Sequence, residues 1–205
     1  MSAILAKKLG MTQVFQEDGS VARVTVLQAG PCPVTAIRTP ERDGYEAVQL
    51  AFGQAKEKHL TKAEIGHLKK ADAPPLRHVV EFRDEAGELV LGESVTVEAF
   101  EAGQRVKISG TSKGKGFQGT IKRHNFASGP KSHGSHNKRA PGSIGASAWP
   151  ARVMKGIRGP GQMGNKRVTQ KGLEIVSIDA KENLLLVRGS VPGPRGGVVE
   201  VRSDA

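Results

Sequence analysis

No Asp or Glu occurs between Glu101 and Glu174, although this stretch carries 15 Lys and Arg residues. The whole chain has 31 basic and 20 acidic residues, so the remainder has 16 against 20 and is slightly negative. Globular surfaces normally intersperse both signs, because unrelieved like charge destabilises the compact state. The composition of this stretch therefore predicts that it lies against a polyanion, and nucleic acid is the foremost candidate.

The centre of the stretch, residues 110–167, is also poor in the residues that build a core. Its few large apolar side chains are scattered among Gly, Ser and cations, and pairs such as Gly129-Pro130 and Pro141-Gly142 oppose regular structure. About two helical turns are expected over residues 116–124. We predict that 110–167 is a long, mostly irregular extension that orders against its partner.

Both ends of the chain, in contrast, have the pattern of short strands. Strands are expected at residues 3–9, 13–15, 21–27, 34–37, 45–52, 78–82, 95–100, 105–108, 173–178, 184–187 and 198–201. Gly10 separates the first two, residues 17–20 form a tight turn, and an acidic loop covers residues 84–88. The spacing is typical of a barrel or sandwich. We predict a mainly β fold whose closed β-barrel body comprises 1–109 and 168–205.

One helix stands out within the first hundred residues. Thr61 and Glu64 have the spacing of a capping box, in which a hydroxyl and a carboxylate satisfy the first free amides of a helix. Ile65 and Leu68 would face inward, and Pro74-Pro75 prevents continuation. Together with the neighbouring strands, this helix predicts a small α+β insertion in the body.

Cysteine use and hydropathy exclude several classes of protein. Cys32 is the single cysteine, which rules out an internal disulfide and a cysteine-rich zinc site and predicts a small buried side chain. The first residues lack the apolar core of a signal peptide, and no apolar run approaches the length of a membrane span. We expect a cytoplasmic protein with no membrane partner.

Three motifs have alternative readings that the charge pattern disfavours. Gly114-x-Gly116-x-x-Gly119 fits a dinucleotide fingerprint, but that site needs an acid about 20 positions further on to hold a ribose, and none occurs before Glu174. The glycines are better explained as positions where phosphates approach the backbone amides closely. His133 and His136 have no third ligand nearby in sequence, which argues against a metal. No carboxylate within the segment could orient a histidine for nucleophilic catalysis. A carboxylate supplied by the body remains an alternative.

The identity of the polyanion and the place of the single tryptophan are left open by composition. Trp149 would pack on RNA, on a barrel edge or in a core. An irregular, Gly-rich arm suits folded RNA, whereas readers of regular duplex usually present a helix or ribbon. The competing functions are an enzyme acting on RNA or a nucleotide, and a general DNA-compacting protein.

The chain resembles a known family, the universal large-subunit ribosomal protein L-three in its bacterial form. The matching motifs run along the whole chain, and together they are highly specific. They are Leu9-Gly10-Met11-Thr12, Ala29-Gly30-Pro31-Cys32-Pro33-Val34, Asp43-Gly44-Tyr45, Gly110-Thr111-Ser112-Lys113-Gly114-Lys115-Gly116-Phe117, Ser132-His133-Gly134-Ser135-His136, Pro141-Gly142-Ser143-Ile144-Gly145 and Asn183-Leu184-Leu185-Leu186-Val187.

The resemblance implies a barrel like that of translation factors and a structural role without enzymatic activity. It implies binding to large-subunit rRNA near its 3′ end, a part in starting subunit assembly, and an extension that reaches towards the peptidyl transferase centre. Neighbours would be the L-fourteen and L-nineteen families, with no cofactor, metal or small-molecule substrate. Expected RNA contacts are Lys113, Lys115, Lys122, Arg123, His124, Lys131, His133, His136, Lys138, Arg139, Trp149, Arg152, Lys155, Arg158, Lys166 and Arg167.

The chain departs from the family pattern near the expected tip of the extension. Many bacterial relatives have Gln two residues before the proline that follows Pro-Gly-Ser-Ile-Gly, and in some this Gln is methylated. Ala148 occupies the place here, so that modification is not expected. Trp149 and Ala151 replace the usual Thr and Gly, and residues 155–161 replace a more usual run of lysines, Met and Ala.

Overall fold

A computed structural model describes residues 3–83 and 89–204. Residues up to 112 and from 167 onwards form one compact unit, and residues 113–166 form a second. We call the first the barrel unit and the second the basic unit. The acidic loop expected at 84–88 lies outside the described residues.

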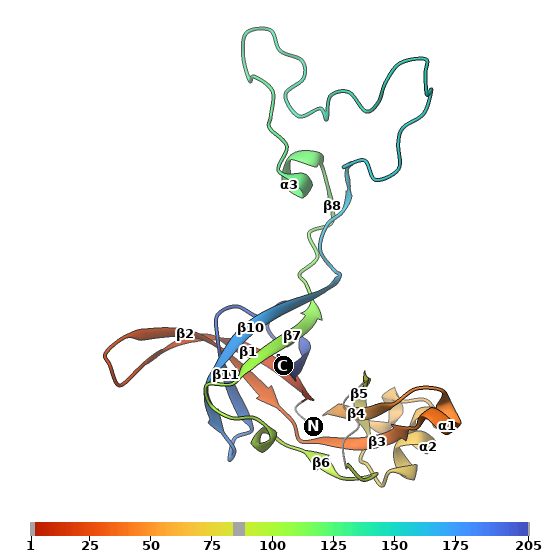
Figure 1. The fold of residues 1–205 in the computed structure, drawn as a ribbon, viewed down its shortest axis with the longest axis vertical. Coiled ribbons are helices and arrows are strands. Elements are labelled where there is room, and N and C mark those ends of the chain that lie inside the picture. Colours follow the sequence, from red (N-terminus) through yellow and green to blue (C-terminus); the bar gives the residue numbers. More distant parts are fainter. Residues whose placement is uncertain (1–2, 84–88, 205) are drawn as a thin grey trace. The chain divides into compact units, whose positions relative to one another are not determined.

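Six strands of the barrel unit close into an antiparallel barrel in the order β1-β12-β7-β10-β11-β2, and β2 pairs with β1 (Figure 1). The strands are β1 (Ala3–Phe15), β2 (Val21–Ala29), β7 (Arg105–Thr111), β10 (Arg167–Asp179), β11 (Leu184–Arg188) and β12 (Val198–Ser203). The predicted closed barrel and mainly β fold are therefore confirmed.

Closure depends on pairing the two ends of the chain. Ile4 of β1 lies opposite Val201 of β12, and β12 in turn pairs with β7, the strand that precedes the basic unit. The barrel strands supply completely buried side chains to the core, as for Ile4, Leu27 and Ile108. The barrel is thus assembled from segments on both sides of the basic unit in sequence.

Two strands are longer than the sequence patterns indicate. Gly10, expected to separate two strands, instead lies within β1 at a shift of register between Lys8 and Gly10. β10 begins at Arg167 rather than near Leu173, again with a register shift, between Gln170 and Leu173. A β-bulge lets one strand bend while continuing to pair, so these positions curve the sheet and do not end it.

A second sheet, in the order β5-β4-β3-β6, forms the predicted α+β insertion. Helix α2 begins as expected, because the Thr61 hydroxyl accepts from the Glu64 amide at 3.3 Å and the Glu64 carboxylate accepts from the Thr61 amide at 2.7 Å. Leu68 of this helix is buried, as expected, whereas Ile65 is only half-buried. The elements are β3 (Cys32–Arg38), β4 (Ala47–Gln54), α2 (Lys62–Lys70), β5 (Leu76–Arg83) and β6 (Ser94–Val95).

The segment expected as a strand over residues 95–100 is mostly not one. Only Ser94–Val95 pairs, with Cys32 and Pro33, and the chain then turns into the 3-10 helix η2 (Val97–Ala99). Its apolar residues serve the core all the same, since Val97 and Phe100 are buried. Two short elements that the patterns did not indicate, α1 (Pro40–Asp43) and η1 (Glu57–His59), complete the insertion.

The insertion and the barrel share one continuous hydrophobic core. Buried residues of the insertion, such as Val34, Leu50 and Phe82, belong to the same cluster as Ile4 and Ile108 of the barrel. In addition, the guanidinium of Arg202 on β12 lies over the Phe82 ring, 4.8 Å from its centroid. The two sheets therefore form one packed body.

The basic unit contains little regular structure. It has the two-residue strands β8 (Phe117–Gln118) and β9 (Gly161–Gln162), which pair, and the short helix α3 (Thr120–His124), which is about half the length expected.

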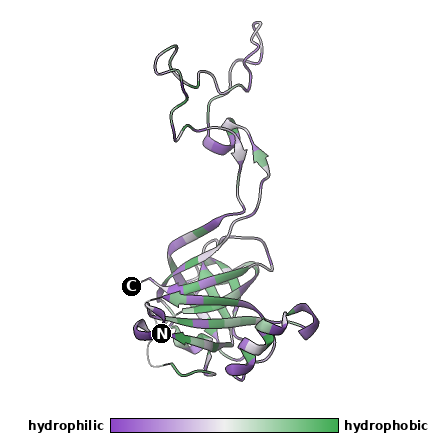
Figure 2. Ribbon diagram, turned by 90° about the vertical axis from the view of Figure 1, so that its right-hand side faces the viewer, coloured by the Kyte–Doolittle hydropathy of each residue, from purple (hydrophilic) through white to green (hydrophobic). Residues whose placement is uncertain are grey.

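Figure 2 shows hydrophobic positions alternating with hydrophilic ones along the barrel strands. Among residues 3–83 and 89–204, no helix is long and apolar enough to cross a membrane.

Candidate nucleic-acid interface

The two arms of the basic unit are joined where they begin and end. The Lys115 amide donates to the Met163 carbonyl, and the Met163 amide donates to the Gly116 carbonyl, both at 2.9 Å. Gly164 makes this pairing possible: it has a φ of +72°, and a Cβ there would lie 2.1 Å from the Lys113 carbonyl oxygen. The pairing brings the cations at the start of one arm beside the end of the other.

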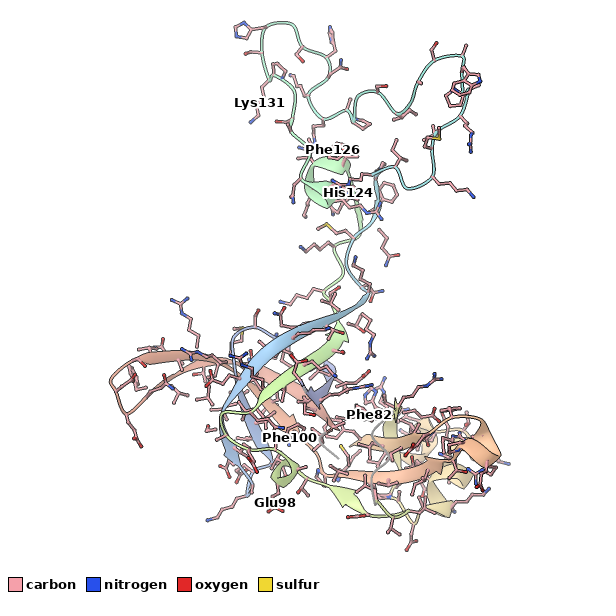
Figure 3. All side chains as sticks on the ribbon, in the orientation of Figure 1. Phe82, Glu98, Phe100, His124, Phe126 and Lys131 are labelled. Carbon is pink, nitrogen blue, oxygen red and sulfur yellow. The ribbon has the colours of Figure 1, made fainter. Side chains whose placement is uncertain are left out.

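Helix α3 is held against the returning arm by two of the predicted RNA contacts. The Arg123 guanidinium donates to the Gly159 carbonyl at 2.8 Å, and the His124 Nε2 lies 3.1 Å from the same oxygen. Both side chains are half-buried, and a Cβ on Gly161 would lie 2.8 Å from Arg123 Nη1. His124 also lies near Phe126, with ring centroids 6.1 Å apart (Figure 3). Arg123 and His124 thus position the arms.

A second close approach forms a loop between residues 129 and 138. The Gly129 amide donates to the Lys138 carbonyl at 3.2 Å, and a Cβ on Gly129 would lie only 2.3 Å from the Asn137 carbonyl oxygen. This glycine therefore lets the loop close. The loop presents cations and imidazoles, all exposed, at Lys131, His133, His136, Lys138 and Arg139.

The remaining predicted contacts in the basic unit are likewise exposed, with Lys122 on α3 among them. Trp149 is 87% exposed, which excludes the core role considered for it. A Trp this exposed is unusual, since this side chain is highly buried on average in folded proteins. The exposed positions are Lys113, Lys115, Lys122, Trp149, Arg152, Lys155, Arg158 and Lys166.

Arg167 differs from the other predicted contacts, because it belongs to the barrel unit and has an acidic partner. Its Nη2 lies 2.5 Å from Glu200 Oε2, and its Nη1 pairs with the other carboxylate oxygen. Hydrogen bonds to Glu200 raise the pKa of Arg167, although partial burial opposes this. The structure therefore gives Arg167 a role in the barrel.

The two units differ sharply in charge. Of the 31 Lys and Arg residues, 11 lie in residues 113–166 and none of the 20 Asp and Glu do, which leaves 20 basic against 20 acidic residues elsewhere. The barrel unit is therefore formally neutral, and the entire net charge of +11 resides in the basic unit. Without a carboxylate of its own, the basic unit cannot neutralise its cations internally.

The alternative readings of the motifs find no support in this geometry. Residues 114–119 do not lead into a long helix, and the backbone at Lys115 and Gly116 is already bonded to Met163. Within the part of the chain that the structure describes, no three His, Cys, Asp or Glu side chains gather as metal ligands. Cys32 is buried as expected, and burial raises the pKa of its thiol to about 12.

Sequence reasoning did not identify two polar features of the barrel unit, a buried lysine and a groove lined by basic side chains. Lys8 is buried in the barrel, where its Nζ donates to the Val191 carbonyl at 2.6 Å. Lys7, Arg77 and His78, given no strong role, line one groove of the barrel unit. Lys7 comes from β1 and the other two come from β5, which is far from it in sequence, so no local signal could have grouped them.

These features fit the class of basic nucleic-acid-binding proteins in which an irregular cationic segment is inserted into a folded β-barrel. Comparison with known proteins specifies the class further. Residues 54–184 match the family described as Ribosomal protein L3. The chain belongs to this family, in its bacterial type.

Several relatives match along nearly their whole length, and each is named large ribosomal subunit protein uL3. The protein of a Synechococcus species is 53% identical over 97% of this chain and 93% of its own. Those of Acidothermus cellulolyticus and Streptomyces coelicolor are each 52% identical over 100% of this chain, and over 93% and 97% of their own lengths.

Proposed function

We propose that this protein is a structural component of the large ribosomal subunit and binds its rRNA through residues 110–167, with 1–109 and 168–205 as the body. One observation carries the proposal: the basic unit has 11 Lys and Arg residues and no acid. Phosphates supply the missing negative charge, and counterion release on contact favours binding. Family membership supports ribosomal RNA as the partner.

The contacts within the basic unit divide into two kinds. Exposed cations such as Lys131 and Arg158 are placed to meet phosphates, which fix position and carry little sequence information. Trp149 offers a free aromatic face to an unstacked base, and His133 and His136 offer imidazoles to bases or phosphates. Arg123 and His124 contribute by holding the arms in register.

The resemblance to the family extends the proposal to a place in the subunit. The protein would bind rRNA near its 3′ end early in assembly, and the extension would reach towards the peptidyl transferase centre. RNA performs the chemistry there, so the role requires no catalytic group from this chain. The exposed, irregular character of residues 125–160 supports a segment shaped by surrounding RNA.

Contacts with neighbouring proteins of the L-fourteen and L-nineteen families are part of the proposal. An apolar surface is available on the hairpin of β1 and β2, where Met11, Phe15 and Val21 are exposed. Beyond Lys8, no strand among the described residues pairs with the outer edge of β1. Exposed apolar side chains on an open strand edge are typical of protein interaction sites.

A direct test compares the purified full chain binding to a fragment of large-subunit rRNA and to duplex DNA of equal length. We expect preference for the rRNA, and an affinity that falls by about 10³–10⁵ over a fourfold rise in salt if about 6–10 phosphates are neutralised. Equal affinity for the DNA would instead indicate a general compacting protein. An affinity that does not depend on salt would refute the electrostatic interface.

The cellular counterpart is the position of the tagged chain in a sucrose gradient of lysate at moderate salt. Migration with the large subunit, lost only when the particle is stripped, is the expected result. Migration as free protein or with the chromosome would contradict the ribosomal role.

A further inference from the structure

The barrel unit contains a groove of about 760 Å³ between the barrel and the insertion. Its walls come from both sheets: Lys7 and Gln28 lie on β1 and β2, while Gln54 and Arg77 lie on β4 and β5. Because the sheets share one hydrophobic core, the walls are held at a fixed separation. The volume is within the range of small-molecule and nucleotide sites.

Four polar side chains that line the groove have no polar partner among the described residues. Within residues 3–83 and 89–204, the side chains of Lys7, Gln28, Gln54 and Arg77 make no hydrogen bond or ion pair. The next residue along β1 shows the contrast, since Lys8 is buried and bonded to the Val191 carbonyl. Two cations and two amides thus converge on one groove with their donors available.

The lining of the groove also contains apolar residues and a histidine ring that lies close to a glycine. Phe52 lies opposite His78 in the pairing of β4 with β5, and Pro31 and Pro33 extend the same surface. A Cβ on Gly53, which has a φ of +80°, would lie 3.3 Å from His78 Cδ2. Burial, aided by the charge of Arg77, lowers the pKa of His78, which favours its neutral ring.

We propose that this groove binds a short single-stranded segment of RNA, with phosphates held by Lys7 and Arg77 and a base lying against the His78 ring and Pro31, which are more exposed than the buried Phe52 and Pro33. The proposal rests on the proposed function and adds a second contact with RNA, outside the basic unit. Among the lining residues that the structure describes, Asp72 is the one carboxylate, so donors outnumber acidic acceptors. A ring available for stacking beside cationic donors is the combination that binds single-stranded nucleic acid.

Photo-cross-linking tests the groove on the full chain. The probe is a single-stranded RNA of about twelve nucleotides, which spans a typical binding site, with 4-thiouridine distributed along it. Cross-linked peptides are identified by mass spectrometry in the wild type, in the double variant Lys7→Ala with Arg77→Ala, and in a control, Lys171→Ala with Lys181→Ala. The control removes the same charge from exposed positions of the barrel unit outside the groove.

We expect wild-type cross-links in peptides containing residues 28–33 or 72–78, in addition to those of the basic unit. The groove cross-links should fall by about tenfold in the Lys7/Arg77 variant, the size expected for loss of charged hydrogen bonds, and persist in the control. Circular dichroism spectra that match the wild type establish that both variants fold.

Other outcomes separate this inference from the proposed function. Cross-links confined to residues 113–166 would leave the function standing and overturn the groove site. An equal decrease in both double variants would overturn it too, by showing an effect of net charge alone. If an acidic peptide carrying a photo-reactive group labels the groove and RNA does not, the groove is a protein site. Absence of cross-links anywhere would count against both proposals.

Discussion

Arg167 reaches across strand β7 to Glu200 on β12, and its guanidinium meets both oxygens of the carboxylate. Glu200 is largely buried, and Arg202 contacts it as well at 3.4 Å. The pair therefore ties together the three strands β10, β7 and β12 at the point where the chain returns to the barrel. Arg167, the last residue of the extension predicted from the sequence, therefore belongs to the barrel in structure.

The first prediction concerns this pair. Arg167→Ala should lower the free energy of unfolding by about 1 kcal/mol, the upper range for exposed ion pairs, because the largely buried Glu200 loses its bidentate partner. Urea unfolding followed by circular dichroism measures the change. Arg188→Ala is the matched control, since the Arg188–Glu174 pair is about half-exposed on both sides and should contribute less. Equal losses would show that the burial of Glu200 has no effect.

Arg123 should act through geometry more than through charge. Arg123→Lys keeps the charge but loses the planar guanidinium that donates to Gly159. We expect affinity for the rRNA fragment to fall by about tenfold, the size of one charged hydrogen bond, with the salt dependence unchanged. The comparison is Lys122→Ala, which should reduce the slope of log affinity against log salt by about 0.7–0.9. A reduced slope for Arg123→Lys would contradict a positioning role.

Gly164 should be intolerant of a side chain. In Gly164→Ala the new Cβ would meet the Lys113 carbonyl oxygen, and the positive φ adds strain of about 1–3 kcal/mol. The arms should separate, and affinity for the rRNA fragment should drop by about tenfold or more. Gly159→Ala provides the control, because a Cβ there meets nothing within 4 Å and φ is not positive. Similar affinities for the two variants would refute the importance of the close approach.

Trp149 should contribute to binding and not to folding. Because its side chain is exposed, Trp149→Ala should change the free energy of unfolding by less than about 0.5 kcal/mol. Loss of a stacked base should weaken binding to the rRNA fragment by about 1–3 kcal/mol, and Trp149→Phe should restore part of it. A destabilised variant with unchanged binding would return Trp149 to a packing role.

Low pH should lower the stability of the insertion through a cluster of charged side chains centred on Arg38. This side chain pairs with Asp43 at 2.9 Å and with Glu81 at 3.2 Å, and Glu81 also accepts from the Tyr45 hydroxyl. Desolvation raises the pKa of both carboxyls, but hydrogen bonds from the neighbouring arginines and, at Glu81, from Tyr45 outweigh it. The pKa of each therefore lies below its ordinary value.

The sign of the pH effect follows from that shift. A lowered pKa in the folded state stabilises the protein above the ordinary carboxyl pKa of about 4, and this contribution disappears as pH falls through the folded value. Urea unfolding at about pH 7 and about pH 3 should therefore show Arg38→Gln less stable than wild type at neutral pH, with the difference shrinking in acid. A constant difference would contradict the assignment.

Local chemistry made several elements predictable from the sequence. The capping box at Thr61 and Glu64 marks the start of α2, because it depends on residues three positions apart. The turn before β2 is equally local: the Gln16 amide donates to the Ser20 carbonyl, and Gly19 has a positive φ. The cationic character of residues 113–166 is a property of composition alone.

Features that depend on distant partners could not be predicted in this way. Gly10 has the local signature of a break, yet it lies in a bulge, because pairing with β2 continues on both sides of it. Lys8 resembles any surface lysine until the Val191 carbonyl, from the other end of the chain, is seen to accept from it. The partner of Arg167 is likewise contributed by β12. The Lys8 contact spans 183 positions of the sequence and the Arg167 contact spans 33, distances over which local pattern carries no information.

Thr111 and Arg167 lie opposite each other in adjacent antiparallel strands, so in topological terms the basic unit is an oversized hairpin loop. The entropic cost of closing a loop grows only with the logarithm of its length, by about 0.6 kcal/mol for each doubling. Changes in the length or sequence of this loop, which could follow changes in the RNA, should therefore have little effect on the stability of the barrel. The barrel can thus evolve slowly while the length and sequence of the loop evolve quickly.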